Sequence, residues 1–333
     1  MNTLRQAFEN LGVPINKYYS SEIKPFANEL TQHHFPGTIQ LGNILNWKEW
    51  DIDWKSIDFI GSGSPCKDLS IAGKMKGING SNSGLFWQFI EILNHVKKLN
   101  PNVLFLQENV YSASRKEIGI MSEALEIYPQ MIDSALVTAQ LRKRWYWTNI
   151  STKNTMFDVV VDIKQPKDKG ILLKDVLEHG YTDRDKARAI LESESRLNTD
   201  MDKMYRRYKT TGFGNVVYQI NPNKQSNGQQ PFMQNRVFSD KGKHTTLTES
   251  HAGRTKIAYE YKGAFKIRPL TQIELERLQG FPDGYTNILT RNQAASLLGD
   301  GWTLPIIEHI LSFIPEYQKN TNQKNKSLAL AKF

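Results

Sequence analysis

The sequence predicts an α/β protein with a doubly wound, mostly parallel sheet and a small domain inserted into it. In the first half of the chain, strand-like and helix-like segments alternate, which is typical of parallel strands joined by crossover helices. The strand-like segments are solidly apolar, as in strands that are covered on both faces. Between about 165 and 260 short polar segments replace the alternation, and order returns near Ile267. This change of pattern predicts the inserted domain.

Apolar spacing and loop residues place the elements of the first half. Leu4, Ala7 and Phe8 recur at helical spacing in the first expected helix. The long helix at 85–99 follows a Gly/Ser/Asn-rich loop and ends before Asn100-Pro101. In chain order, the expected elements are a helix at 3–11, a strand at 17–23, a helix at 24–31, strands at 38–41 and 57–60, a helix at 85–99, a strand at 103–106, a helix at 115–127, and strands at 131–138 and 144–150.

The C-terminal part returns to regular structure. A helix at 271–278 is expected because Thr271 can cap it and Glu274 follows three residues later. A final helix is expected at 305–313, and the Lys/Asn/Gln-rich tail is expected to be mobile. The predicted division is 1–160 for the first part of the α/β domain, 161–262 for the inserted domain, 263–316 for the return to the α/β domain, and 317–333 for the tail.

Composition narrows the compartment and the partners. Apolar residues make up 39% of the chain, which is enough for a sizeable core. No run of about 18 apolar residues occurs, so no membrane span is predicted. The first residues lack the apolar stretch of a signal peptide, and the single cysteine fits the reducing cytoplasm. The excess of 43 basic over 34 acidic residues, 43 − 34 = 9, favours a polyanionic partner such as nucleic acid.

Four polar residues fall at or just after the ends of predicted strands. They are Glu22, Asn43, Cys66 and Glu108. Ligands of doubly wound sheets bind beyond the carboxyl ends of the strands, so these residues are expected on one rim. Cys66 is the only cysteine, and it opens a glycine-rich loop after an apolar run. It is therefore a candidate nucleophile; the alternative is a small buried apolar residue.

Five segments in a fixed order then carry a family resemblance. They are Gly-Ser-Pro-Cys at 63–66, Glu-Asn-Val at 108–110, Gln-Leu-Arg-Lys-Arg-Trp-Tyr-Trp-Thr-Asn at 140–149, Arg-Pro-Leu-Thr-Gln-Ile-Glu-Leu-Glu-Arg-Leu-Gln-Gly-Phe-Pro at 268–282, and Gly-Asp-Gly-Trp-Thr at 299–303. Together they resemble the DNA cytosine-5 methyltransferases, from about residue 4 to residue 315. The resemblance implies a Rossmann-like, S-adenosylmethionine-dependent fold with a target-recognition domain at 161–262. It also implies methyl transfer to carbon 5 of a cytosine in a specific duplex DNA sequence.

The resemblance implies roles for four catalytic residues. The thiolate of Cys66 adds to carbon 6 of the ring, and Glu108 supplies an acid proton at nitrogen 3. Arg144 holds the cytosine O2, and Arg142 supports the site or contacts a backbone phosphate. From the residues alone, Glu108 could equally be a helix-capping or surface carboxylate, and the two arginines a surface charge pair.

The implied methyl donor is S-adenosylmethionine, and no metal is implied. Glu22 would bind the ribose hydroxyls; the alternative is a carboxylate at a helix N-terminus. The residues implied at the donor site are Glu22, Ile23, Asn43, Pro65, Leu85, Asp300 and Trp302.

The target carbon is hidden in the duplex, so the base must be flipped out. Ser70, Lys74 and Lys76 belong to the glycine-rich loop 67–84, which is expected to contact DNA; a flexible surface loop is the alternative. Arg206 and Arg207 lie beside tyrosines in the recognition domain and suit phosphate contact; a solvated helix face is the alternative.

The chain departs from the family pattern at its start. It lacks the opening strand and the Phe-x-Gly-x-Gly loop, so an open slot in the sheet is expected. Asn43 stands where an Asp is usual, and Lys67 where a Gln is common. Three explanations remain: an N-terminally truncated enzyme, a split enzyme whose partner chain supplies the strand, or an inactive DNA-binding relative. A monomer is expected unless such a partner exists. The expected setting is restriction–modification, with a cognate endonuclease, or phage self-protection, in a bacterial or phage-infected cytoplasm.

Overall fold

A seven-stranded sheet forms the centre of the protein in the computed structural model, in the order β2-β1-β15-β3-β4-β7-β5. The structure describes residues 2–63, 85–180, 182–190, 201–211, 215, 217–219, 237–239, 256–258, 266–315 and 328–333. The strands are β1 Ile15–Ser20, β2 Thr38–Gln40, β3 Phe59–Gly63, β4 Leu104–Val110, β5 Gln130–Asp133, β6 Gln140–Leu141, β7 Lys143–Thr148, β8 Thr152–Asn154, β9 Val159–Val161, β10 Ala187–Arg188, β11 Val217–Gln219, β12 Val237–Ser239, β13 Lys256–Ala258, β14 Lys266–Arg268 and β15 Leu328–Lys332. The α-helices are α1 Thr3–Asn10, α2 Pro25–His34, α3 Leu85–Leu99, α4 Arg115–Leu125, α5 Leu173–Val176, α6 Met201–Thr211, α7 Gln272–Gln279, α8 Arg291–Asp300 and α9 Leu304–Leu311, with 3₁₀ turns η1 Ile44–Glu49, η2 Trp54–Ser56 and η3 Ser134–Leu136.

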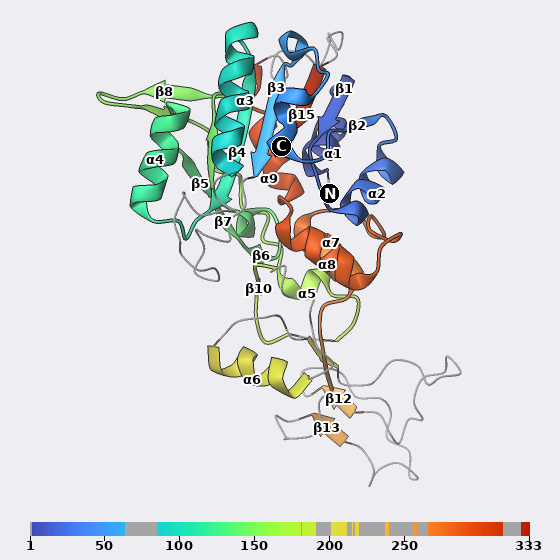
Figure 1. Ribbon diagram of the computed structural model, residues 1–333. Coiled ribbons are helices and arrows are strands. Elements are labelled where there is room, and N and C mark those ends of the chain that lie inside the picture. The colour runs from blue at the N-terminus through green and yellow to red at the C-terminus, as the bar shows by residue number, and fades with distance from the viewer. Residues whose placement is uncertain are drawn as a thin grey trace.

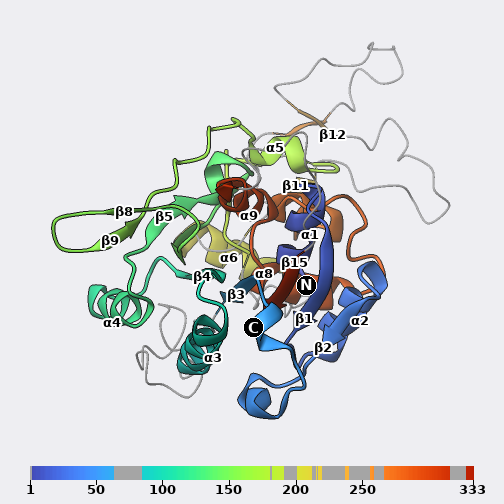
Figure 2. The ribbon, with the colours of Figure 1, turned by 90° about the horizontal axis from the view of Figure 1, so that it is seen from above.

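The sheet is mostly parallel and covered on both faces, as the sequence predicts. Strands β2, β1, β15, β3 and β4 run parallel, whereas β7 is antiparallel to both β4 and β5. Helices α3 and α4 lie on one face, and α1 and α9 lie on the other (Figures 1 and 2). Edge-to-face packing of Phe8 in α1 on Phe59 in β3 joins the second layer to the sheet. The carboxyl end of β3 points toward the part of the molecule that contains α6 (Figure 1).

Strand β15 fills the position in the sheet where the sequence predicts an open slot. It lies between β1 and β3, parallel to both, with Leu330 in register with Tyr18 and Phe59. Residues Leu328–Ala331 are buried. The expectation of an open slot is therefore wrong, because a segment more than 260 residues away in sequence pairs with the two strands that border it. The prediction of a mobile tail is wrong for 328–333; the preceding residues 316–327 lie outside the described residues.

The apolar core around the central sheet, here called the body, continues beyond the predicted boundary at residue 161. Leu173, Val176, Ala187 and Ile190 are buried in the same apolar cluster as the sheet. The ammonium of Lys186 donates to backbone carbonyls of the body. Helix α6 and the strand pairs β11–β14 and β12–β13 lie farther from the sheet (Figure 1). The described part of the inserted segment therefore divides near residue 190 into a portion packed on the body and a portion beyond it.

Candidate active site at the carboxyl ends of the strands

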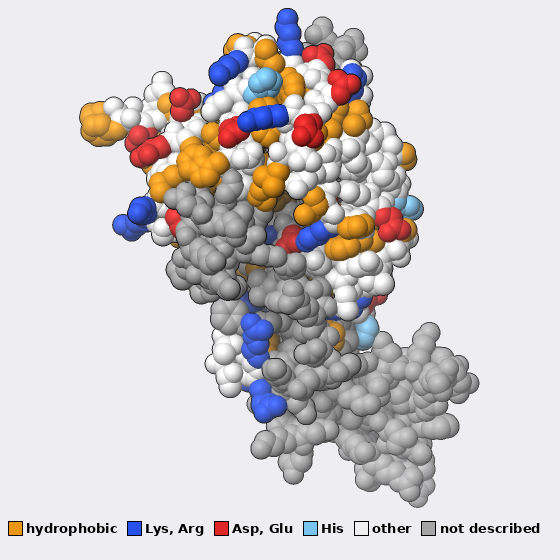
Figure 3. Space-filling view, in the orientation of Figure 1, with side chains coloured by type: hydrophobic (Ala, Val, Ile, Leu, Met, Phe, Trp, Pro, Cys, Tyr) orange, Lys and Arg blue, Asp and Glu red, His pale blue; other side chains and the backbone are white. Residues whose placement is uncertain are grey.

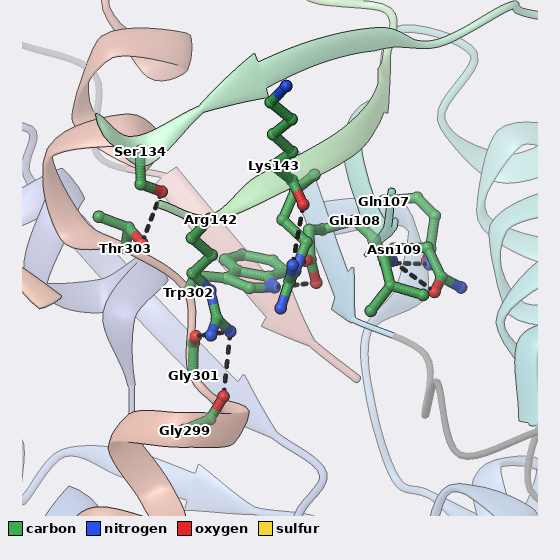
Figure 4. A network of polar contacts seen from close by, with 12 residues as sticks. Gln107, Glu108, Asn109, Ser134, Arg142, Lys143, Gly299, Gly301, Trp302 and Thr303 are labelled. Atoms are coloured by element: carbon green, nitrogen blue, oxygen red, sulfur yellow. Dashed lines mark hydrogen bonds and ion pairs between the residues drawn. The ribbon is translucent and has the colours of Figure 1, made fainter. Parts of the chain in front are cut away.

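Glu108 is the centre of a buried polar network on β4. Nε of Arg144 in β7 lies 2.8 Å from Oε1 of Glu108, and the two side chains are 16% and 11% exposed. The indole Nε1 of Trp302, between α8 and α9, donates to Oε2 of Glu108 at 3.1 Å. Figure 4 shows the Trp302 side chain directed at this carboxylate. One carboxylate oxygen therefore accepts a hydrogen bond and the other forms an ion pair, so Glu108 is held in one orientation.

Two glycines of β3 leave the space that Trp302 occupies. A Cβ at Gly63 would lie 2.8 Å from Nε1 of Trp302 and 3.5 Å from Oε2 of Glu108. A Cβ at Gly61 would lie 2.6 Å from Leu4 of α1 and 3.3 Å from the Trp302 ring. A Cβ at either position would thus lie within 3.3 Å of the Trp302 ring system. A larger residue at either position would therefore displace the ring. The glycines of β3 are thus required for the contact between Trp302 and Glu108.

Arg142 is buried and anchors the segment between α8 and α9. Its Nη2 donates to the carbonyls of Gly299 at 3.0 Å and Gly301 at 2.8 Å (Figure 4). Its backbone N–H donates to Oδ1 of Asp133 at 3.0 Å. The side chain is 4% exposed, so its guanidinium fixes the backbone on either side of Asp300 rather than facing solvent.

Tyr146 lies beside Glu108 in the register of β4 and β7. It is 2% exposed. Burial raises the pKa of its hydroxyl far above the usual value of 10.0, and the charge of Glu108 raises it further. The hydroxyl is therefore held in its neutral form next to the carboxylate.

Glu22 and Asn43 follow neighbouring strands at the same rim. Oε1 of Glu22 accepts from the backbone N–H of Ile23 at 2.8 Å and of Lys24 at 2.9 Å, at the start of α2. Oδ1 of Asn43 accepts from the N–H of Leu45 at 3.0 Å and caps η1. Each carboxylate or amide oxygen has two lone pairs, so both residues keep capacity for another donor. The helix-terminal position considered as the alternative for Glu22 is thus present, and both of these hydrogen bonds use the same carboxylate oxygen, Oε1.

Lys24 connects this rim to the segment that carries Trp302. Its ammonium lies 2.6 Å from Oδ2 of Asp300, with the side chains 32% and 45% exposed. Ile23 is 70% exposed. The pair brings residues 22–24 next to Asp300, two residues before Trp302. Leu85 is the first residue of α3 and is half-buried.

Two of the basic residues expected to contact DNA, Arg206 and Arg207, are exposed on α6. Arg206 and Arg207 point away from the buried side of the helix, where Tyr208 is 3% exposed. The Arg184 guanidinium lies 3.8 Å from the centre of the Tyr208 ring, and Tyr205 stacks on Tyr208 with ring centres 6.5 Å apart. Lys and Arg side chains appear on the surface where Figure 1 draws α6 (Figure 3). The tyrosine side of α6 is thus packed against Arg184, and Arg206 and Arg207 are exposed to solvent.

Several predicted site residues lie outside the described residues. They are Cys66, Pro65, Ser70, Lys74 and Lys76. The structure brings Glu108, Arg144, Arg142 and Trp302 together, and it brings Glu22 near Asp300 through Lys24. The sequence interpretation missed the contact between Trp302 and Glu108, and it missed Lys24 altogether. No local signal could have revealed either contact, because each joins segments almost 200 residues apart or more.

Known proteins identify the family. The sequence profile of the C-5 cytosine-specific DNA methylases matches residues 1–316. The chain belongs to the C-5 cytosine-specific DNA methylase family. Its relatives include the type II methyltransferase M.HhaI of Haemophilus parahaemolyticus, which is 25% identical over 92% of this chain and 89% of that protein. The type II methyltransferase M.MspI of Moraxella sp. is 25% identical over 97% of this chain and 70% of that protein.

Solved structures agree on the fold. The Entamoeba histolytica methyltransferase EhMeth has a TM-score of 0.58 at 15% identity, over 96% of each chain. The S. pombe Dnmt2 methyltransferase has a TM-score of 0.54 at 14% identity, over 96% of each chain. The protein is thus a DNA (cytosine-5-)-methyltransferase-class enzyme with a Rossmann-like α/β fold. The N-terminal truncation expected from the sequence stays a prediction.

The chemistry of the rim fits the methyl donor that this methyltransferase family implies. S-adenosylmethionine carries a sulfonium, an ammonium, two ribose hydroxyls and one carboxylate. Carboxylates of Glu22 and Asp300 suit the hydroxyls and cationic groups, and the Asn43 amide suits the adenine edge. Among the described residues, no helix is long and apolar enough to cross a membrane. The same residues contain no group of three or more His, Cys, Asp or Glu side chains that could hold a metal ion.

Proposed function

We propose that this methylase transfers a methyl group from S-adenosylmethionine to carbon 5 of a flipped-out cytosine in a specific duplex DNA sequence. The observation that carries the proposal is the buried pair of Glu108 and Arg144, held by Trp302 at the end of β4. The neighbouring strand β3 ends at Gly63, three residues before Cys66 in the sequence. A thiol, an acid and a guanidinium are the groups that the reaction at a cytosine ring requires.

Cys66 is the proposed nucleophile. Its thiolate adds to carbon 6, which forms a sulfur–carbon bond and makes carbon 5 nucleophilic. Glu108 donates a proton to ring nitrogen 3 as electron density moves into the ring. Arg144 holds the O2 atom. After methyl transfer, a base takes the proton from carbon 5, the sulfur–carbon bond breaks to restore the double bond and release Cys66 as a thiolate, and nitrogen 3 returns its proton to Glu108.

Arg144 is the group that must change partners when the base arrives. Oε1 of Glu108 is paired with Arg144 and Oε2 accepts from Trp302, so the protonated carboxyl that is to donate to ring nitrogen 3 loses its ion pair with Arg144. Trp302 is 5% exposed and wedged against β3, whereas Arg144 is more exposed and donates its Nη1 to its own strand at Lys143. The less confined arginine is therefore the one that turns from Glu108 toward the O2 atom. Arg142, which binds backbone carbonyls, supports the loop that carries Trp302.

The donor site is proposed at the ends of β1 and β2 and beside α8. When bound, S-adenosylmethionine supplies an electrophilic methyl group. Glu22 would orient the ribose through its hydroxyls, and Asn43 would accept from the adenine amine. Asp300 closes the site against Lys24. The remaining proposed donor contacts are Ile23, Pro65, Leu85 and Trp302.

DNA binding is proposed for two parts of the chain. Arg206 and Arg207 are exposed on α6 and would neutralise phosphates of the duplex. Ser70, Lys74 and Lys76, in the loop that follows Cys66, would contact DNA around the flipped base. Relatives are named type II methyltransferases and, in Bacillus phage SPR, an orphan methyltransferase. These names support a role in restriction–modification, with a cognate endonuclease, or in phage self-protection.

Methyl transfer and covalent trapping test the proposal together. The protein is incubated with long duplex DNA of mixed sequence and a donor labelled on its methyl group. Label is expected in the DNA as 5-methylcytosine, and DNA containing 5-fluorocytosine is expected to form a denaturant-resistant adduct. Cys66→Ser should abolish both signals while duplex binding persists. Duplex binding by the wild type without transfer and without an adduct would instead support an inactive DNA-binding relative.

A further inference from the structure

Lys332 occupies an unusual place for a lysine, near the centre of a mostly parallel sheet. It ends β15, in register with Ser20 of β1 and Gly61 of β3. The rest of the strand is Leu-Ala-Leu-Ala, all buried. Strands covered on both faces are normally apolar throughout, whereas this strand ends on a half-buried lysine. A cation at this position therefore calls for a functional explanation.

The surroundings of Lys332 are acidic and aromatic. Its ammonium lies 5.4 Å from the centre of the Trp302 ring, on the face of the sheet where Trp302 meets Glu108. Burial lowers the pKa of Lys332 below the usual value of 10.5, and the charges of Glu22 and Glu108 oppose that effect. The two carboxylates thus favour the charged form of a partly desolvated ammonium.

The position of β15 puts Lys332 between the two ends of the proposed donor site. Glu22 follows β1, and Glu108 lies on β4. Strands β15 and β3 separate them, so three inter-strand spacings of about 4.8 Å give roughly 14 Å between the two strands. A donor that binds Glu22 through its ribose and presents its methyl group near Glu108 must extend across the end of β15. Its amino-acid end is then close to Lys332.

We propose that Lys332 binds the carboxylate of the amino-acid end of S-adenosylmethionine, so that β15 supplies a donor-binding residue. The proposal rests on the proposed function, because it presupposes that donor. The carboxylate is the only anionic group of the donor. The carboxylates of Glu22 and Glu108 would repel it, whereas the ammonium of Lys332 would attract it. The same carboxylates would attract the ammonium and the sulfonium. The alternation of charge along the rim therefore matches the alternation of charge along the donor.

Calorimetry with two ligands and three proteins tests this assignment. The ligands are S-adenosylhomocysteine and an analogue that lacks only its carboxylate. The proteins are the wild type, Lys332→Met, and Lys48→Met as a matched control, since Lys48 is 73% exposed and faces Glu91 of α3 at 3.6 Å. Hydrogen bonds to charged groups are worth about 1.5–3 kcal/mol. Wild type and Lys48→Met are therefore expected to bind S-adenosylhomocysteine about 10- to 150-fold more tightly than the analogue.

Lys332→Met is expected to lose that preference and to bind both ligands as the wild type binds the analogue. Equal weakening for both ligands, or an undiminished preference, would overturn the assignment and leave the donor site itself in place. If Lys332→Met does not fold, the wild type alone decides, because equal affinity for the two ligands excludes recognition of the carboxylate. Failure of the wild type to bind either ligand would overturn the proposed function together with this inference.

Discussion

Leu330→Ala, in the central strand β15, is expected to lower the free energy of unfolding by about 3–4 kcal/mol. Leu330 is 0% exposed and in register with Tyr18 and Phe59 on the two neighbouring strands. The substitution removes three carbons, which costs about 2.4 kcal/mol at about 0.8 kcal/mol per methylene. The residual cavity adds the rest, because strands paired on both sides cannot collapse freely around it.

Urea denaturation followed by tryptophan fluorescence measures this loss. The reporters are suited to the region, since Trp147 and Trp302 are buried at the sheet. Leu45→Ala is the matched control: the same three carbons are removed from a side chain that is 57% exposed, so a change within about 0.5 kcal/mol is expected. A Leu330→Ala protein as stable as Leu45→Ala would refute the placement of β15 and would restore the prediction of a mobile tail.

Three further outcomes are expected. Stability should fall as pH rises above about 10, because burial raises the pKa of Tyr146 and its neutral form is then retained only in the folded state. Tyr146→Phe should reduce that slope by up to about 1.4 kcal/mol per pH unit between pH 10 and 11; identical slopes would contradict the burial. A double-mutant cycle of Trp302→Phe and Glu108→Gln should give a coupling of about 1–2 kcal/mol in unfolding, whereas additive losses would deny their hydrogen bond. Gln40→Met should stabilise the donor-free protein by about 1–3 kcal/mol, since both amide atoms are buried without a partner among the described residues; a loss of stability would reveal a partner for that amide.

Local signals predicted the regular elements well where they were strong. The helix α3 has the bounds that its apolar period and the following Asn-Pro indicated. Thr271 and Glu274 form the reciprocal capping box expected from their spacing. These features depend on contacts within about four residues, which the sequence displays directly. The strand ends were less well predicted; β4 extends to Val110, so Glu108 lies inside the strand rather than after it.

The candidate site also has contacts that the sequence predicted and contacts that only the structure shows. The motifs indicated Glu108 and Arg144 together, and the structure joins them because β4 and β7 pair antiparallel in a register that brings them to one face. The motif that contains Trp302 suggested a wall of the donor site, and the structure adds its hydrogen bond to Glu108. That bond requires two glycines on a third strand, and no pattern in one segment reports space left by another.

The order of residues alone was sufficient for the fold class and for the family, because strand periods, helix caps and catalytic motifs are local or ordered along the chain. It could not place the last five-residue strand, whose Leu-Ala-Leu-Ala run is too short and too weakly flanked to stand out. That strand is held by β1 and β3, more than 260 residues earlier. Pairing at such separation depends on a gap that exists only after the other strands have assembled, and the same gap decides that Lys332 meets the carboxylates of the rim.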